Sequence, residues 1–126
     1  MSFKTPRALA TGLGTAHSGT HHWWVQRLSS IALIPLSVLF VIPFAGALGQ
    51  GHEAVIALYS NPFHAIVAIL TIAVAFQHLH QGLQVVIQDY VHHKGWLTAA
   101  LTGAWMLSGA AGLAGVFAVL KIAFAG

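Results

Sequence analysis

The uncharged stretch "AVIALYSNPFHAIVAILTIAVAFQHLHQGLQVVIQ", residues 54–88, decides the fold of this chain. A helix needs only about 20 mostly apolar residues to cross the hydrocarbon core of a membrane. This stretch is longer than that and contains no Asp, Glu, Lys or Arg. Residues 28–50 form a second uncharged stretch, and residues 95–120 form a third. The sequence therefore predicts an all-α membrane protein with three transmembrane helices.

The composition of the chain agrees with a membrane location. Of its 126 residues, 57% are hydrophobic and 6% are charged, whereas an ordinary soluble domain has about 25% charged residues. There is no cysteine, which excludes disulfides, thiolate nucleophiles and iron–sulfur clusters ligated by this chain. No basic patch with interleaved aromatic residues is present, so we expect membrane lipid and no nucleic acid as its surroundings.

The chain is expected to form one transmembrane domain over residues 1–126. We predict an N-terminal arm at 1–26 and helices at about 27–48, 63–88 and 96–124, joined by a short loop at about 50–62 and another at 89–95. Pro35 and Pro43 fall inside the first helix. Proline removes a backbone donor and tends to kink a helix, although membrane helices tolerate it. The first helix is therefore expected to be bent.

The distribution of basic residues predicts the orientation in the membrane. Lys4, Arg7 and Arg27 precede the first helix, and Lys94 lies between the second and third helices. The loop between the first two helices carries Glu53 and no Lys or Arg. Cytoplasmic loops are enriched in Lys and Arg, so we predict a cytoplasmic N-terminus and, after three spans, a C-terminus outside the cytoplasm. No cleaved signal peptide is expected.

Two histidines, His78 and His80, lie inside the second predicted helix. A lipid-facing imidazole there would be costly, so each is expected to face a partner. On a helix of 3.6 residues per turn these two positions lie about 200° apart. They point in nearly opposite directions and cannot bind one metal ion together.

A single stripe of this helix contains His78, Gly82, Val85 and Asp89 and is roughly 16 Å long. Gly82 leaves room for something broad and flat, and haem is a natural occupant with a neutral imidazole as its axial ligand. From spacing alone, His78 is either a haem ligand or a partner in a hydrogen bond between helices. No second core histidine is evident on the other two helices, so a second axial ligand would have to come from another subunit.

The residue pair Asp89-Tyr90 directly follows the second predicted helix and also allows two interpretations. It can be an ordinary helix end with an interfacial tyrosine. Alternatively, a phenol donor beside a carboxylate can bind a quinone carbonyl and help to deliver protons. Arg27 either anchors the first helix at the interface or pairs with a buried anion such as a haem propionate.

Two segments resemble the small hydrophobic membrane-anchor (D) subunit of succinate dehydrogenase, respiratory complex II. Residues 78–92, "HLHQGLQVVIQDYVH", look like the H-x-x-x-G-x-x-Q-V-x-x-D-Y-V segment of that family. Residues 18–36, "SGTHHWWVQRLSSIALIPL", are similar to the H-x-W-x-x-x-R sequence that precedes the first helix in bacterial members. Together with the three-span plan, these segments cover most of the chain.

The resemblance implies a role for individual residues. It makes His78 the axial ligand of haem b and therefore the one metal ligand in this chain. It makes Tyr90 a hydrogen-bond donor to ubiquinone, with Asp89 beside it, and it places Arg27 and His21 near the haem propionates. His80 is expected only to bond a neighbouring helix.

The resemblance also implies a multi-pass protein of the bacterial inner membrane with a periplasmic C-terminus, and a place for the chain in a larger enzyme. A flavoprotein subunit with FAD would oxidise succinate, and an iron–sulfur subunit would pass the electrons on. This chain and a cytochrome b (C-type) anchor subunit would share one haem b and build the ubiquinone reduction site. The chain itself has no dehydrogenase site. Two alternatives are an anchor of a fumarate reductase working with menaquinone, and a small non-redox membrane scaffold.

Overall fold

The computed structural model describes residues 5–11 and 16–125, and the only regular secondary structure among these residues is helix. In chain order the helices are α1 (Pro6–Thr11), α2 (Ala16–Gln50), α3 (His52–Ser60), α4 (Pro62–Tyr90) and α5 (Lys94–Ala125). Three stretches are long and apolar enough to cross a membrane, namely Gly19–Gln50, Pro62–Tyr90 and Lys94–Ala125. The prediction of an all-α protein with three transmembrane helices is confirmed.

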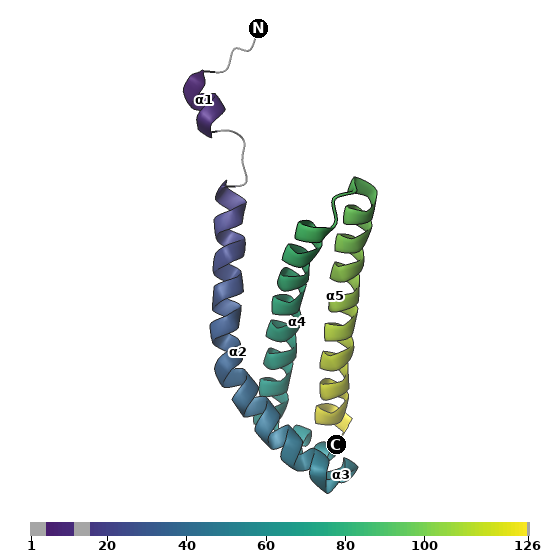
Figure 1. Cartoon of the computed structure of the whole chain (residues 1–126). Helices are drawn as coiled ribbons and strands as arrows, with labels where there is room; N and C mark the ends of the chain where they lie inside the picture. Colours follow the sequence, from purple (N-terminus) through teal and green to yellow (C-terminus); the bar gives the residue numbers. More distant parts are fainter. Residues whose placement is uncertain (1–4, 12–15, 126) are drawn as a thin grey trace.

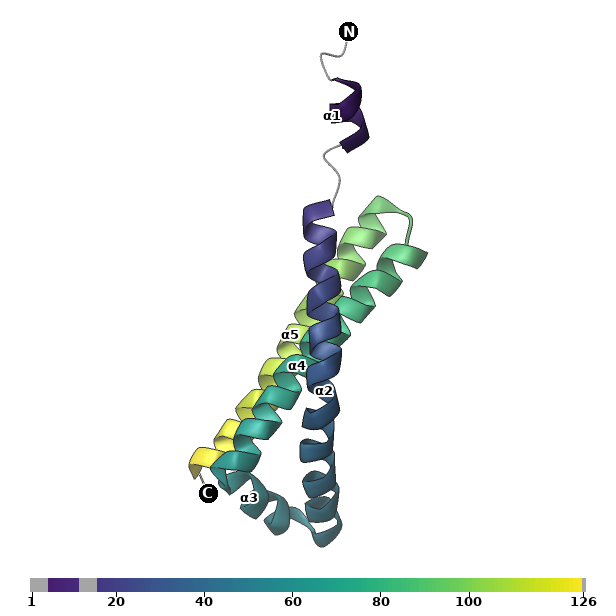
Figure 2. The ribbon, with the colours of Figure 1, turned by 90° about the vertical axis from the view of Figure 1, so that its left-hand side faces the viewer.

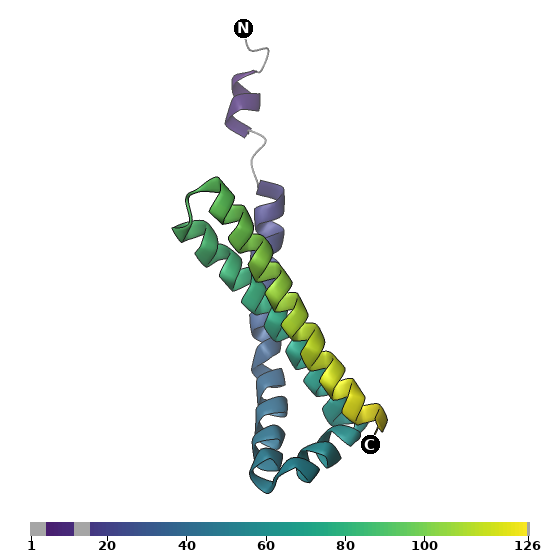
Figure 3. The ribbon, with the colours of Figure 1, turned by 90° about the vertical axis from the view of Figure 1, so that its right-hand side faces the viewer.

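The three long helices lie side by side in one layer, with α4 in the middle (Figure 1). Helix α4 packs against both α2 and α5, whereas no Cα atom in the described part of α2 comes within 8 Å of one in α5. Figures 2 and 3 show α2 crossing the α4–α5 pair at an angle, with α3 bridging the lower ends. Helix α3 also contacts α4. Beyond this contact α4 has neighbours on two sides, and its two remaining faces stay open.

The observed helices differ from the predicted ones in two ways: α2 begins earlier, and the predicted loop at 50–62 contains a further helix. Helix α2 begins at Ala16 rather than near residue 27, so part of the predicted arm is helical. An apolar run marks only the membrane-crossing part of a helix, whereas its backbone hydrogen bonds can continue into the polar interface. The predicted loop at 50–62 contains α3. Gly51, with φ 104°, and the Asn61-Pro62 pair bound this short apolar segment.

The predicted bend in the first membrane helix is visible in Figure 1, where the lower part of α2 turns toward α3. Pro35 and Pro43 both lie inside α2. Each proline removes one backbone donor from the hydrogen-bond ladder, which allows the axis to change direction there. The bend turns the end of α2 toward α3, through which the chain returns to the lower end of α4 (Figure 2).

Tyr59 anchors this reversal. Its side chain is buried and lies against the rings of Phe40 and Phe44, with centroid distances of 6.5 and 6.3 Å. Burial raises the pKa of the Tyr59 phenol, so the ring enters the cluster as a neutral group. The following helix is capped by Asn61, whose side-chain oxygen accepts a hydrogen bond from the Phe63 backbone N–H at 2.9 Å.

The contact between α4 and α5 depends on glycines in α5, since small residues let two membrane helices approach closely. A Cβ atom added at Gly112 would lie 3.3 Å from the Cβ and Cγ atoms of Phe76. One added at Gly115 would lie 3.3 Å from the side chain of Ile72. These two glycines therefore set how closely α4 and α5 approach.

We expect Gly112→Leu to destabilise the α4–α5 pair by about 1–3 kcal/mol, because the new side chain would have to displace Phe76 in a filled contact. The matched control is Gly103→Leu. Gly103 lies about 180° around α5 from Gly112 and has no atom within 4 Å of a built Cβ. Thermal unfolding of the detergent-solubilised protein measures the difference, and equal melting temperatures for the two variants would contradict this account.

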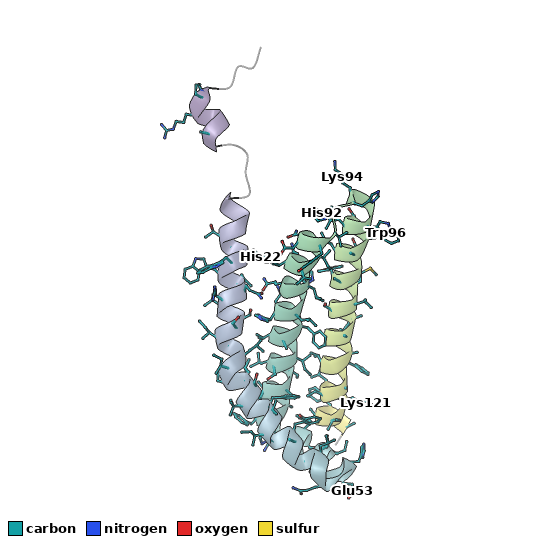
Figure 4. All side chains as sticks on the ribbon, in the orientation of Figure 1. His22, Glu53, His92, Lys94, Trp96 and Lys121 are labelled. Carbon is teal, nitrogen blue, oxygen red and sulfur yellow. The ribbon has the colours of Figure 1, made fainter. Side chains whose placement is uncertain are left out.

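The orientation can be tested because the chain contains no cysteine of its own. Figure 4 shows Lys94 at one end of the helical layer and Glu53 at the other. We expect a membrane-impermeant maleimide to label Lys94→Cys only from the cytoplasmic side and Glu53→Cys only from the periplasmic side. Labelling of right-side-out and inside-out vesicles measures this, and the reverse pattern would show that the predicted orientation is wrong.

Candidate functional site

His78 lies in α4 and meets α2 through both nitrogens of its ring. Its Nδ1 lies 2.9 Å from the hydroxyl oxygen of Ser29, and its Nε2 lies 3.5 Å from the amide nitrogen of Gln26. The first distance is a good hydrogen bond, whereas the second is at the limit of one. His78 is therefore held firmly at Nδ1 and only weakly at Nε2.

The part of α2 opposite His78 forms a polar seam, which consists of His22, Gln26 and Ser29. These residues are spaced four and three positions apart and so lie on one side of the helix. His22 Nε2 and Gln26 Oε1 are buried and have no hydrogen-bond partner. Sequence reasoning assigned no role to this seam, although its helical spacing could have revealed it.

His80 points to the other side of α4, as predicted. It lines a groove of about 350 Å³ between α4 and α5, together with Trp105 and Ser108. Its Nδ1 is buried without a hydrogen-bond partner. The two histidines therefore face different neighbouring helices: His78 faces α2 and His80 faces α5.

Four glutamines, at positions 77, 81, 84 and 88, lie along α4. Their spacing of four, three and four residues places them on one side of the helix. Gln77 and Gln88 are exposed, whereas Gln81 is 5% exposed with its Oε1 unpaired. Exposed amides are expensive next to lipid, so this polar stripe is expected to be covered by another molecule in the membrane.

The predicted haem stripe on α4 is open beyond His78. A Cβ built on Gly82 would have no atom within 4 Å, and Val85 is 45% exposed. Asp89 and Tyr90 are exposed at the end of the helix, Tyr90 to 80%. These exposed side chains leave space for a ligand or a partner subunit.

Arg27 and His21 are not in contact with His78. The Arg27 guanidinium lies 5.2 Å from the centre of the Trp23 ring, a cation–π contact on an exposed part of α2. His21 is exposed, whereas its neighbour His22 is half-buried in the polar seam. Both predicted propionate-binding residues, Arg27 and His21, are thus exposed. His22 is a third polar group next to them in the sequence.

The described residues contain no group of three or more His, Cys, Asp or Glu side chains that could hold a metal ion. A single imidazole is nevertheless sufficient as one axial ligand of a haem whose other ligand is supplied elsewhere. The fold and the site therefore define a membrane-embedded helical subunit with one well-held imidazole, open helix faces and a carboxylate–phenol pair at a membrane boundary.

Comparison with known proteins identifies the family. Residues 1–120 match the model of the succinate dehydrogenase/fumarate reductase transmembrane subunit family. The chain belongs to this family, and the resemblance to a succinate dehydrogenase membrane anchor is confirmed.

Individual relatives agree with this assignment. The chain is 35% identical to a succinate dehydrogenase hydrophobic membrane anchor subunit of Paracoccus denitrificans, over 97% of this chain and 94% of the relative. It is 34% identical to the subunit of that name in Rickettsia conorii, over 73% of this chain and 75% of the relative. No solved structure matches the chain at a significant level. Three apolar helices and bacterial relatives fit a multi-pass protein of the inner membrane.

One position departs from the sequence pattern that carried the resemblance. The pattern has glutamine three residues after the glycine, where this chain has Val85, and Gln84 comes one residue earlier. The positions of His78, Gly82, Asp89 and Tyr90 agree with the pattern. The departure therefore affects the polar stripe of α4 and none of the predicted ligand-binding residues.

Proposed function

We propose that this chain, as the membrane anchor of a succinate dehydrogenase, shares one haem b with a cytochrome b anchor subunit and forms part of the ubiquinone reduction site. The observation that carries the proposal is the placement of His78. It lies in a membrane helix, is fixed at Nδ1 by Ser29, and stands about three turns from Asp89 and Tyr90.

The surroundings of His78 fit a haem ligand. Ligating imidazoles usually bond a neighbouring group through the nitrogen that does not bind the metal, and Nδ1 of His78 has such a partner at 2.9 Å. Nε2 has only a long contact to Gln26, which a side-chain rotation would remove. Gly82, one turn further along, leaves space beside the ring. A bound haem would supply one-electron redox chemistry at this place.

The second axial ligand and the cover of α4 would come from the cytochrome subunit. His80, the other intramembrane histidine near His78, faces α5. The polar stripe of α4 also carries side chains that suit a protein neighbour better than lipid, among them Gln77 and Gln84. A partner helix with polar groups would satisfy these amides and complete the haem site.

Asp89 and Tyr90 would form this chain's share of the quinone site. The Tyr90 hydroxyl can donate a hydrogen bond to a quinone carbonyl, and the adjacent carboxylate can accept and release protons. Both side chains are exposed at the end of α4, near the predicted cytoplasmic surface. Arg27 and His21 would pair with the haem propionates from the same end of the layer.

The flavoprotein and iron–sulfur subunits of a succinate dehydrogenase would deliver the electrons, since this chain has no cysteine to hold a cluster. The same anchor could serve a fumarate reductase and menaquinone, because the family includes both enzymes. The non-redox scaffold remains the second candidate. One observation favours the scaffold: the hydrogen bond between His78 and Ser29 joins α2 and α4 by itself, without a haem.

We expect His78→Leu to remove or alter the b-type signal in a reduced-minus-oxidised spectrum of the purified native complex. His80→Leu, the matched control on the opposite side of α4, should leave that signal in place. Subunit content is matched by gel before the spectra are compared. Loss of haem only in His80→Leu would move the site to the α5 side, and a colourless wild-type complex would favour the scaffold.

We expect Tyr90→Phe to lower ubiquinone reduction by roughly a hundredfold, since it removes a proton donor, while haem content and assembly persist. The chain has one other tyrosine, Tyr59. It is buried in α3, at the opposite end of α4 from Tyr90. Tyr59→Phe should therefore leave quinone reduction unchanged. Succinate oxidation with a soluble dye acceptor is the internal control. Full quinone reduction by Tyr90→Phe would show that the phenol has no such role.

A further inference from the structure

The hydroxyl group of Ser29 has two hydrogen-bond partners. It donates to the backbone carbonyl oxygen of Gln26 at 2.9 Å and lies 2.9 Å from Nδ1 of His78. Ser29 is 8% exposed, so water does not compete strongly for either bond. The neighbouring Ser30 also donates to the Gln26 carbonyl at 2.9 Å, whereas the hydrogen-bond partners of His78 are Ser29 and Gln26.

The number of hydrogens decides the direction of the second bond. A hydroxyl has one hydrogen to donate, and a carbonyl oxygen can only accept. The Ser29 hydrogen is directed to Gln26, so its lone pairs face His78 and Nδ1–H is the donor. A neutral imidazole carries one ring hydrogen, so Nε2 is left with a free lone pair. The amide nitrogen of Gln26, a donor, lies on that side at 3.5 Å.

We propose that Ser29 is the positioning residue for His78: it fixes the imidazole in the tautomer and orientation that leave Nε2 free to bind iron. This inference rests on the proposed haem ligation by His78 and adds a residue on a different helix. When a neighbouring group accepts a hydrogen bond from the ring nitrogen that does not bind the metal, the imidazole becomes a more basic ligand. A more basic ligand favours the oxidised iron, so Ser29 lowers the reduction potential of the haem.

The test uses the purified native complex with three variants. Ser29→Ala removes the acceptor and is expected to raise the haem midpoint potential and to lower haem affinity by about tenfold or more. Ser30→Ala loses an equivalent bond to Gln26 without touching His78, and is expected to match the wild type. Ser29→Thr keeps the hydroxyl, and its extra methyl group can enter the groove that Ser29 lines with Val25 and Ala32. It is expected to restore wild-type values.

The readouts are a redox titration of the haem band, the low-temperature spectrum of the oxidised haem, and the haem-to-subunit ratio. A wild-type potential and spectrum in Ser29→Ala would overturn the proposal, as would an equal shift in Ser30→Ala. If the complex with Ser29→Ala does not assemble, Ser29→Cys is used instead, because its thiol is similar in shape to the hydroxyl and is a weaker hydrogen-bond acceptor. An unchanged haem midpoint potential in Ser29→Cys would then overturn the proposal.

The outcome also separates this inference from the proposed function. If His78→Leu removes the haem signal while Ser29→Ala behaves like Ser30→Ala, the haem ligation stands and the positioning role fails. If His78→Leu retains the full signal, the ligand assignment itself fails. A shift in Ser29→Ala together with loss in His78→Leu supports both.

Discussion

The hydrocarbon core of a membrane offers no hydrogen bonds, and this constraint shapes α4 more than any other element. The helix carries two histidines and four glutamines within its last 14 residues, which is about four turns. Each of them costs free energy wherever it faces lipid. Ser29 meets His78 from α2, His80 lines a groove, and Gln81 is buried with its Oε1 unpaired. Gln77 and Gln88 are exposed. The chain is therefore built to be completed by other molecules.

The layered arrangement makes this possible. Because α2 and α5 pack on opposite sides of α4, neither covers its two faces. A compact three-helix bundle would have enclosed these side chains and left no place for a broad ligand. The close approach at Gly112 and Gly115 holds α5 against α4 without using the polar residues. The α3 reversal around Tyr59 fixes the far end in the same way. Apolar contacts thus hold the layer together and leave the polar groups available.

Polar groups are also concentrated in one half of the layer. The His22–Gln26–Ser29 seam, His78, and the Asp89-Tyr90 pair all lie toward the end where α4 finishes and α2 begins. The opposite half contains the aromatic cluster and the alanine-rich contact of α4 with α5. The residues of the proposed haem and quinone sites thus lie in one half of the layer, and the aromatic cluster lies in the other.

The sequence by itself determined the three membrane helices, the bend at the prolines, the family, and the opposite directions of His78 and His80. These features follow from uncharged length, from the missing proline donor and from helical spacing, all of which are local properties of the chain. The helical start of α2 at Ala16 and the existence of α3 were missed, because hydropathy does not mark where backbone hydrogen bonds end.

Only the tertiary structure decided which groups meet. The rotation of α2 against α4 decides that Ser29 and Gln26 contact His78. It also decides that His22, and not His21, lies in the half-buried polar seam. Likewise, only the structure separated Arg27, on Trp23, from His78. Contacts between helices depend on their relative position and rotation, which packing across the whole layer sets and which no single helical pattern contains.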